Sequence, residues 1–254
     1  MPIIMKGGTY RGGIYRNFIP PLIDNCSGWW DASDASTINL VLGKVSQWDD
    51  KSENKNNLTQ GVAASQPTYV AAGWNGTSPT VSFDGSNDYI TSVFTNSIDI
   101  GNMTIFMAVR INAVTSTDYC FAAEGAGTNS PFSLLFSSNI TDAKLLWEYG
   151  LGVDEVIVPT VQSTADESIY YMNRNIVAKT SDVIFQNTTT TNSEFNIAYT
   201  NNSTASGTPL LGLGGTNGAL NANCYISEFI TYKAILTDHQ RDTVINYLKN
   251  KWGV

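Results

Sequence analysis

The last thirty residues, YISEFITYKAILTDHQRDTVINYLKNKWGV (225–254), contain the two elements that decide the fold. Residues 225–232 predict a strand, because β-branched and aromatic side chains favour extended backbone. Residues 237–251 predict a helix. Its first residues have the spacing of a capping box, with Thr237 as N-cap and Gln240 three positions later. The chain is therefore expected to end in a strand followed by a capped helix.

The predicted helix is amphipathic and needs a surface to pack on. Val244, Ile245, Leu248 and Trp252 fall on one face at helical spacing, and Gly253 follows where a helix can end. A helix of about fifteen residues is marginal alone in water. Burial of each aliphatic side chain contributes roughly 1.5–3 kcal/mol, so docking on a sheet would stabilise it.

The rest of the sequence predicts an all-β body. Only 14% of the 254 residues are charged, and turn signals separate about a dozen short strands. The clearest is 103–114, which is apolar on both faces in its middle and is expected to lie between two layers. The net charge is −8, and all 22 acidic residues follow residue 23. Phosphate binding needs clustered Lys and Arg, so nucleic acid is not an expected partner.

The cysteines and the hydropathy pattern indicate the cellular compartment in which the protein folds. Cys26, Cys120 and Cys224 are too few and too scattered to indicate a disulfide framework, and none has metal-ligand spacing. This favours folding in a reducing cytoplasm. No 18-residue apolar run predicts a membrane span, and no short apolar run at the N-terminus indicates a signal peptide.

Residues 1–26 form a basic segment that precedes the body. GGTYR (7–11) is followed at once by GGIYR (12–16), which is a tandem near-repeat. Tyr and Arg are enriched at interface hot spots, so we predict an extended anchoring arm that docks on another subunit. A flexible leader and an edge hairpin on the same domain are the alternatives. The predicted arm contacts are Tyr10, Arg11, Tyr15 and Arg16.

Three motifs resemble those of laminin-G-like, concanavalin A-like domains from bacteriophage virion proteins. They are Trp-Asp-Ala-Ser (30–33), Trp-Asp-Asp-Lys-Ser (48–52) and Phe-Asp-Gly-x-Asn-Asp-Tyr (83–89). The resemblance implies a concanavalin A-like jelly-roll β-sandwich over residues 27–254, with one C-terminal α-helix and the extended N-terminal arm outside it. It also implies assembly in a virion after folding in the host cytoplasm, with other virion proteins as partners and a trimer as the favoured homo-oligomer.

The resemblance raises the question of catalysis, because the superfamily includes glucanases. Those enzymes carry a Glu-x-Asp-x-x-Glu strand, which no stretch of this sequence matches. Adjacent pairs such as Asp154-Glu155 and Asp166-Glu167 would point to opposite faces of a strand, whereas a retaining pair stands about 5–5.5 Å apart. The one histidine, His239, is expected to be exposed on the terminal helix. We therefore predict no catalytic residue, no cofactor and no enzyme activity.

The predicted function is a non-enzymatic phage virion structural protein, in a capsid decoration, tail or fibre. The alternative is a carbohydrate-binding adhesin or lectin module that recognises cell-surface glycans. Its sugar platform would consist of exposed aromatic rings, although burial in the core is the other explanation for them. The platform candidates are Trp74, Trp147 and Tyr149.

Three local predictions remain open to the structure. Asp84, Asn87 and Asp88 offer oxygen ligands for calcium, or alternatively Asp84 and Asn87 cap their own turns. Asn75-Gly76 predicts a hairpin turn. A second tight turn is predicted at residues 173–175, between strands 169–172 and 176–179.

Overall fold

The structure is a computed structural model. It describes residues 4–5, 8–9, 18–93, 102–113, 117–124, 132–137, 144–147, 156–158, 166–175, 180–187, 193–198, 210–215 and 221–254.

The described elements are mostly strands. They run in the order β1 (Ile4–Met5), β2 (Gly8–Thr9), η1 (Pro20–Leu22), β3 (Cys26–Asp31), η2 (Ala35–Thr37), β4 (Ile38–Val41), β5 (Lys44–Trp48), β6 (Leu58–Thr59), η3 (Ala63–Ser65), β7 (Thr68–Trp74), β8 (Ser78–Asp84), β9 (Ile90–Val93), β10 (Met103–Ala113), β11 (Thr117–Glu124), β12 (Phe132–Ser137), β13 (Lys144–Trp147), β14 (Val156–Val158), β15 (Glu167–Arg174), β16 (Thr180–Asn187), β17 (Ser193–Ala198), β18 (Leu210–Leu213), β19 (Asn223–Tyr232) and α1 (Asp238–Trp252).

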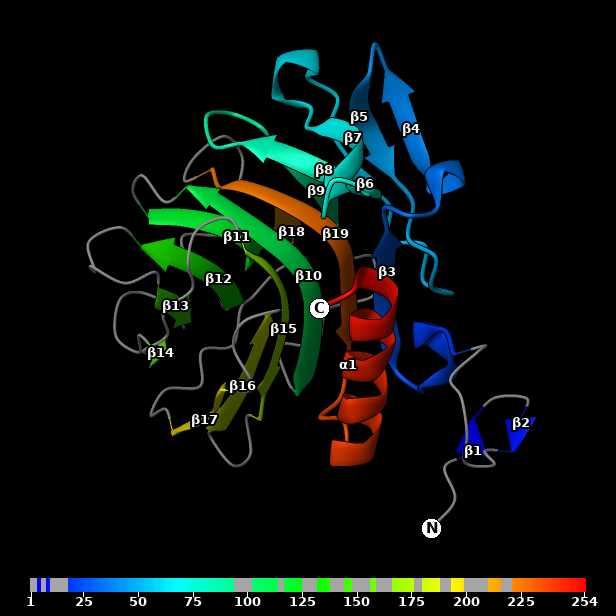
Figure 1. Ribbon diagram of the computed structural model, residues 1–254, viewed down its shortest axis with the longest axis vertical. Helices are drawn as coiled ribbons and strands as arrows, with labels where there is room; N and C mark the ends of the chain where they lie inside the picture. The colour runs from blue at the N-terminus through cyan, green and yellow to red at the C-terminus, as the bar shows by residue number, and fades with distance from the viewer. Residues whose placement is uncertain are drawn as a thin grey trace.

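Every pairing between the described strands is antiparallel, and β19 lies at the centre of the body. It pairs with β10 on one side, and with β3 and β8 along different parts of the other. The sheet curls around this strand, and α1 packs beside β10, β19 and β3 (Figure 1). The prediction of an all-β fold with one C-terminal α-helix is confirmed over the described residues, and the arrangement is consistent with a β-sandwich.

The two faces of β10 enter two different hydrophobic cores. Met103, Ile105, Met107, Val109 and Ile111 belong to the larger cluster, with side chains of β18, β8 and β19. Of the side chains between them, Phe106 and Ala108 belong to a second cluster under α1. Period-two alternation explains this division, because successive side chains of a strand point to opposite faces. The predicted burial between two layers is confirmed.

The terminal helix forms as its sequence predicts. The Thr237 side chain accepts a hydrogen bond from the Gln240 backbone, and the Gln240 side chain accepts one from the Thr237 backbone. Gly253 ends the helix in the left-handed region, at φ +72. The buried face contains Val244, Ile245, Leu248 and Trp252. No helix among the described residues is long and apolar enough to cross a membrane.

Of the two predicted turns, one is confirmed and one is wrong. Asn75 and Gly76 have φ values of +49 and +67, and the Thr77 backbone donates to the Trp74 carbonyl over 3.0 Å, as in a type I′ turn. The turn at residues 173–175 does not form, because β15 continues through Arg174 and its pairing with β16 begins at Val183. Asn173 is tolerated inside the strand since its buried amide donates to the Tyr171 hydroxyl over 2.8 Å.

The packed body starts before residue 27. Phe18 and Ile23 are 7% and 3% exposed and belong to the cluster under α1. The Tyr232 hydroxyl donates to the Pro20 carbonyl over 3.1 Å. The predicted boundary between residues 26 and 27 therefore falls inside β3, and the residues from Phe18 onward pack with the body.

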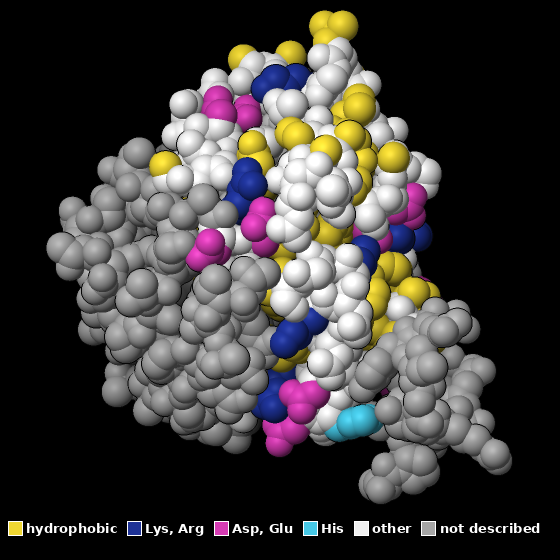
Figure 2. Space-filling model, viewed as in Figure 1, with side chains coloured by type: hydrophobic (Ala, Val, Ile, Leu, Met, Phe, Trp, Pro, Cys, Tyr) yellow, Lys and Arg dark blue, Asp and Glu magenta, His cyan; other side chains and the backbone are white. Residues whose placement is uncertain are grey.

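The β4–β5 hairpin carries apolar side chains into solvent. Leu40, Val41 and Leu42 are 47%, 50% and 101% exposed. Figure 2 shows hydrophobic side chains at this end of the molecule, where Figure 1 places β4 and β5. Leu42 also has a φ of +53, in the left-handed region that a branched side chain disfavours.

Candidate functional site

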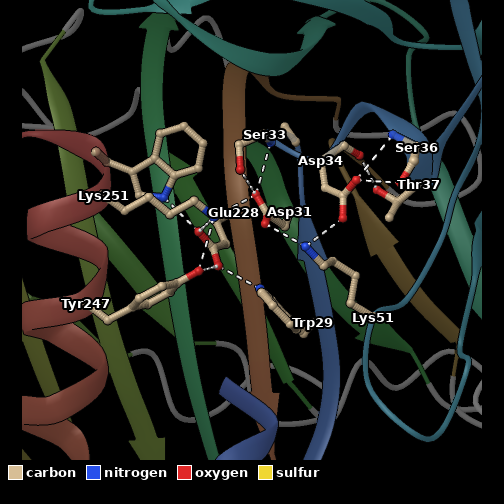
Figure 3. A network of polar contacts seen from close by, with 12 residues as sticks. Trp29, Asp31, Ser33, Asp34, Ser36, Thr37, Lys51, Glu228, Tyr247 and Lys251 are labelled. Atoms are coloured by element: carbon tan, nitrogen blue, oxygen red, sulfur yellow. Dashed lines mark hydrogen bonds and ion pairs between the residues drawn. The ribbon is translucent and has the colours of Figure 1, made fainter. Parts of the chain in front are cut away.

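A polar network joins α1 to β19 and β3, and Glu228 lies at its centre (Figure 3). Glu228 is completely buried, and both of its carboxylate oxygens accept hydrogen bonds. Oε1 accepts from Trp29 Nε1 over 2.6 Å and from the Tyr247 hydroxyl over 2.9 Å. Oε2 accepts from Lys251 Nζ and Trp252 Nε1, both over 2.8 Å. The donors come from β3 and from the last turns of α1.

Asp31 is the cross-strand partner of Glu228 and contributes the second carboxylate. Its oxygens lie 2.7 Å from Lys251 Nζ and 3.0 Å from Lys51 Nζ. The Ser33 hydroxyl donates to Asp31 over 2.6 Å. Lys251 therefore bridges the two buried carboxylates, and the loop that carries Lys51 is tied to the same site.

Burial and charge act in opposite directions on these groups. Burial alone would raise the pKa of Asp31, but Lys251, Ser33 and Lys51 together hold it below its usual value. Burial raises the pKa of Glu228, and Lys251 and the Trp29 hydrogen bond oppose that rise. Burial raises the pKa of the Tyr247 hydroxyl, and Glu228 raises it further, so Tyr247 remains a donor.

The arrangement can anchor the helix but leaves no acceptor free for a ligand. Asp31 and Glu228 are carboxylates on neighbouring strands, and a pair of carboxylates is what a glycosidase uses. Each Glu228 oxygen already accepts two hydrogen bonds from the protein, and the side chain has no exposed surface. A substrate has no route to it. The sequence gives no sign of the pair, because Asp31 and Glu228 come from opposite ends of the chain.

A third buried carboxylate, Asp50, explains the Trp-Asp-Asp-Lys-Ser motif. Asp50 is 1% exposed and accepts hydrogen bonds from the backbones of Trp29, Ser52 and Asn56, over 2.8, 2.7 and 2.9 Å. It thereby fixes the loop after β5 against β3. Trp48 is completely buried in the larger core.

The predicted sugar platform is wrong at the position that the structure describes. Trp74 is completely buried, packs against the Trp252 ring at 5.6 Å between centroids, and donates from Nε1 to the Trp252 carbonyl over 2.7 Å. Its ring has no face open to a sugar, because it fills the core under the end of α1. Trp147 lies in β13, where only the backbone is described, and Tyr149 lies outside the described residues.

The predicted assembly arm is not described. Tyr10, Arg11, Tyr15 and Arg16 all lie outside the described residues. Anchoring on another subunit and trimeric assembly therefore stay predictions.

The Asp84–Asp88 turn is closed by its own hydrogen bonds. Asp84 Oδ1 accepts from the backbones of Ser86, Asn87 and Asp88 over 2.8, 3.2 and 3.4 Å. This is the turn-capping alternative of the sequence analysis. Among the residues whose side chains are described, no group of three His, Cys, Asp or Glu could hold a metal ion. His239 is exposed on α1, as expected.

Comparisons with known proteins give a fold but no family. No protein family matches the sequence, and no curated protein matches it. A Trypanosoma rangeli sialidase solved with sialic acid is 13% identical, with a TM-score of 0.58 over 90% of this chain and 33% of the sialidase. An arabinofuranosidase solved with arabinofuranosyl-α-1,2-xylobiose is 12% identical, with a TM-score of 0.61 over 80% of this chain and 50% of that one.

The chain thus spans about a third of the sialidase and half of the arabinofuranosidase. At this level of identity the similarity shows a shared β-rich fold. It contradicts two predictions from the sequence. The predicted non-enzymatic phage virion structural protein is contradicted, because both of these structures are glycoside hydrolases. The prediction that the chain is not an enzyme is contradicted by the same finding.

Proposed function

We propose that this chain works in carbohydrate processing, as a concanavalin A-like jelly-roll β-sandwich that binds a glycan chain. The observation that carries the proposal is the shared fold over 80–90% of this chain with a sialidase and an arabinofuranosidase. Those two proteins were solved with unrelated sugars, sialic acid in one and arabinofuranosyl-α-1,2-xylobiose in the other. The architecture that they share therefore occurs in proteins that bind different sugars, and it does not indicate one particular sugar.

The network around Glu228 supports the proposal indirectly. A sugar site needs side chains held rigidly on a scaffold, since each loop ordered on binding lowers the affinity. The buried contacts of Asp31, Glu228 and Lys251 fasten α1 to β3 and β19. Hydrogen bonds within the network already occupy the carboxylates of Asp31 and Glu228, so any sugar must bind elsewhere on the body.

The experiment that tests the proposal measures binding and hydrolysis separately on the full chain. Isothermal titration calorimetry against neutral and sialylated oligosaccharides measures binding. Release of nitrophenol from an aryl α-L-arabinofuranoside, and of methylumbelliferone from a sialoside, measures hydrolysis. We expect the folded protein to show binding or hydrolysis with at least one glycan. After thermal unfolding, the same protein should show neither binding nor hydrolysis. Absence of both binding and hydrolysis across neutral and acidic glycans would contradict the proposed function.

A further inference from the structure

The β4–β5 hairpin ends in consecutive aliphatic side chains that are largely exposed to solvent. Leu40 and Val41 are 47% and 50% exposed, and Leu42 at the apex is 101% exposed. They lie at the end of the molecule where Figure 2 shows hydrophobic side chains on the surface. Neither a charged residue nor a proline occurs between Asp34 and Lys44. The hairpin therefore presents an apolar, uncharged surface.

The backbone at Leu42 adds a second indication. Its φ of +53 lies in the left-handed region, which a branched side chain disfavours. Its side chain is fully exposed, so contacts within the chain do not offset this strain. Strained backbone of this kind is concentrated at functional positions. An apolar residue that is both strained and exposed at a hairpin apex indicates a contact made outside this chain.

The strand β4 offers backbone groups for such a contact along its outer edge. All four of its residues pair with β5, and Leu40 lies opposite Val45. The Val45 backbone donates to the Pro67 carbonyl over 2.7 Å, so its N–H points away from β4. At such a position of an antiparallel pair, the backbone groups of both residues point away from each other. The N–H and C=O of Leu40 therefore face the outer edge of β4, where another strand can bond to them.

The sequence of β4 does nothing to prevent pairing along that edge. Native proteins place charged side chains, prolines or bulges on edge strands, because these features block pairing with other chains. No charged residue or proline occurs in β4. The irregular register beside Asn39 comes from an extra residue of β5, Ser46, so β4 itself is not bulged.

Charge favours a second copy of this chain as the occupant. Each copy has a net charge of −8, so two copies repel each other over most orientations. Contact through β4 places an uncharged strand against an identical uncharged strand, where that repulsion is weakest. Antiparallel pairing of one strand with its own copy also generates a twofold axis, which closes the assembly at a dimer.

A lipid bilayer is the less suitable occupant. A single myristoyl chain binds a membrane only marginally, with a constant of about 10⁴ M⁻¹. The hairpin offers less apolar surface than such a chain, since Leu40 and Val41 are already about half covered. A bilayer also provides no backbone groups for the outer edge of β4, whereas a second β4 strand does.

We propose that β4 pairs antiparallel with β4 of a second copy across a twofold axis, and that Leu40, Val41 and Leu42 of each chain are thereby covered by the other. Stable interfaces bury about 1,200–2,000 Å², which is more than two four-residue strands provide, so the dimer is weak. Its dissociation constant should be on the order of 10–100 μM. The proposal is independent of glycan binding, so either can fail without the other.

Sedimentation velocity of the full chain, from about 1 μM to 1 mM, should show conversion of monomer to dimer. Raising NaCl from about 0.05 to 0.5 M should strengthen association, because salt screens the repulsion between two acidic copies. In the wild type, hydrogen exchange of the Leu40 amide should slow at concentrations that form dimer, which tests the edge without a substitution. A chain that stays monomeric throughout this range overturns the proposal.

Two substitutions locate the interface. Leu40→Lys places like charges on the paired edges and should weaken association at least about tenfold. Leu42→Asn removes the apical side chain but suits its backbone, so it should weaken association at least about threefold without loss of thermal stability. The matched control is Ile19→Lys, because Ile19 is 45% exposed and precedes η1, outside the hairpin.

Circular dichroism establishes that each variant is folded, and the control should associate as the wild type does. Dimers that persist unchanged in both hairpin variants would overturn the proposal, because another surface would then hold the copies together. Binding of the monomer to phosphatidylcholine vesicles, lost in Leu42→Asn and without self-association of the wild type, would assign the hairpin to a membrane and overturn it as well.

Discussion

Glu228 on β19 and Asp31 on β3 face each other as cross-strand partners, and Lys251 of α1 lies between their carboxylates. One cation from the last turn of the helix thereby pairs with two buried charges. Removal of one member of a buried ion group costs more than the group itself contributes, because the remaining charge stays buried without its partner. The junction between helix and sheet should therefore be sensitive to single substitutions.

Replacement of Lys251 by Met should destabilise the protein by about 3–5 kcal/mol, since Glu228 and Asp31 would remain as neighbouring buried carboxylates. Urea unfolding followed by tryptophan fluorescence measures the loss. Lys249→Met is the control, because Lys249 stands two residues away on the same helix and makes no ion pair among the described residues. An equal loss in both variants would show that the charge at position 251 is not what matters.

Replacement of Glu228 by Gln should cost about 2–4 kcal/mol. The NH2 group of Gln would replace one carboxylate oxygen, and its hydrogens would face donors that now bond to that oxygen. One buried donor would then lose its acceptor. The Lys251 ammonium would lose half of its counter-charge. Thermal unfolding monitored by circular dichroism, with Asp242→Asn as an exposed control, measures the difference. A melting temperature equal to that of the wild type would contradict the role given to Glu228.

The sequence predicts those features of the structure that are set by residues close together in the chain. The α1 caps and the alternation of β10 depend on neighbours within a few residues, and both are confirmed. The Trp29–Glu228 hydrogen bond joins positions 199 residues apart, and no spacing rule reveals such a pair. The same limit explains the error at Trp74. An aromatic ring suits a core and a sugar platform equally, and the packing of α1 decides between them.

Substitution of Leu42 by Asn should stabilise the protein by about 0.5–1 kcal/mol. Leu42 and Gly43 form the two-residue turn between β4 and β5, with φ values of +53 and +82. Asn adopts this conformation more readily than Leu, and Asn-Gly is the preferred pair in such turns. Leu40→Asn is the control, because Leu40 is also exposed but lacks a positive φ. A destabilised Leu42→Asn variant in urea unfolding would mean that the Leu42 side chain has contacts that outweigh the backbone strain.

Two glycines with similar backbones should respond very differently to alanine. Gly43 and Gly214 have φ values of +82 and +76, but a Cβ at Gly43 meets nothing within 4 Å. A Cβ at Gly214 would collide with the Phe83 ring in the larger core. Gly43→Ala should cost about 1–2 kcal/mol from the backbone alone, whereas Gly214→Ala should cost about 3–4 kcal/mol, because overpacking adds to the strain. Urea unfolding of both variants decides, and equal losses would contradict the predicted collision.

The Asp84–Asp88 turn should make stability depend on pH near neutrality. Burial, and then the charge of Asp84, raises the pKa of Asp88 from its usual 3.8 to about 6. A carboxyl whose pKa is raised on folding favours the folded state while protonated. Its contribution is therefore complete below about pH 4 and is lost as pH rises through about 6.

Asp88→Asn should consequently stabilise the protein at pH 7.5 by about 1 kcal/mol, a value below the full linkage energy because the turn lies near solvent. The gain should be much smaller at pH 4.5, where wild-type Asp88 is largely protonated. Urea unfolding at the two pH values measures both free energies. Asp24→Asn is the comparison, because Asp24 is an exposed aspartate outside this turn. A gain for Asp88→Asn that is equal at both pH values would show that the Asp88 charge is not its source.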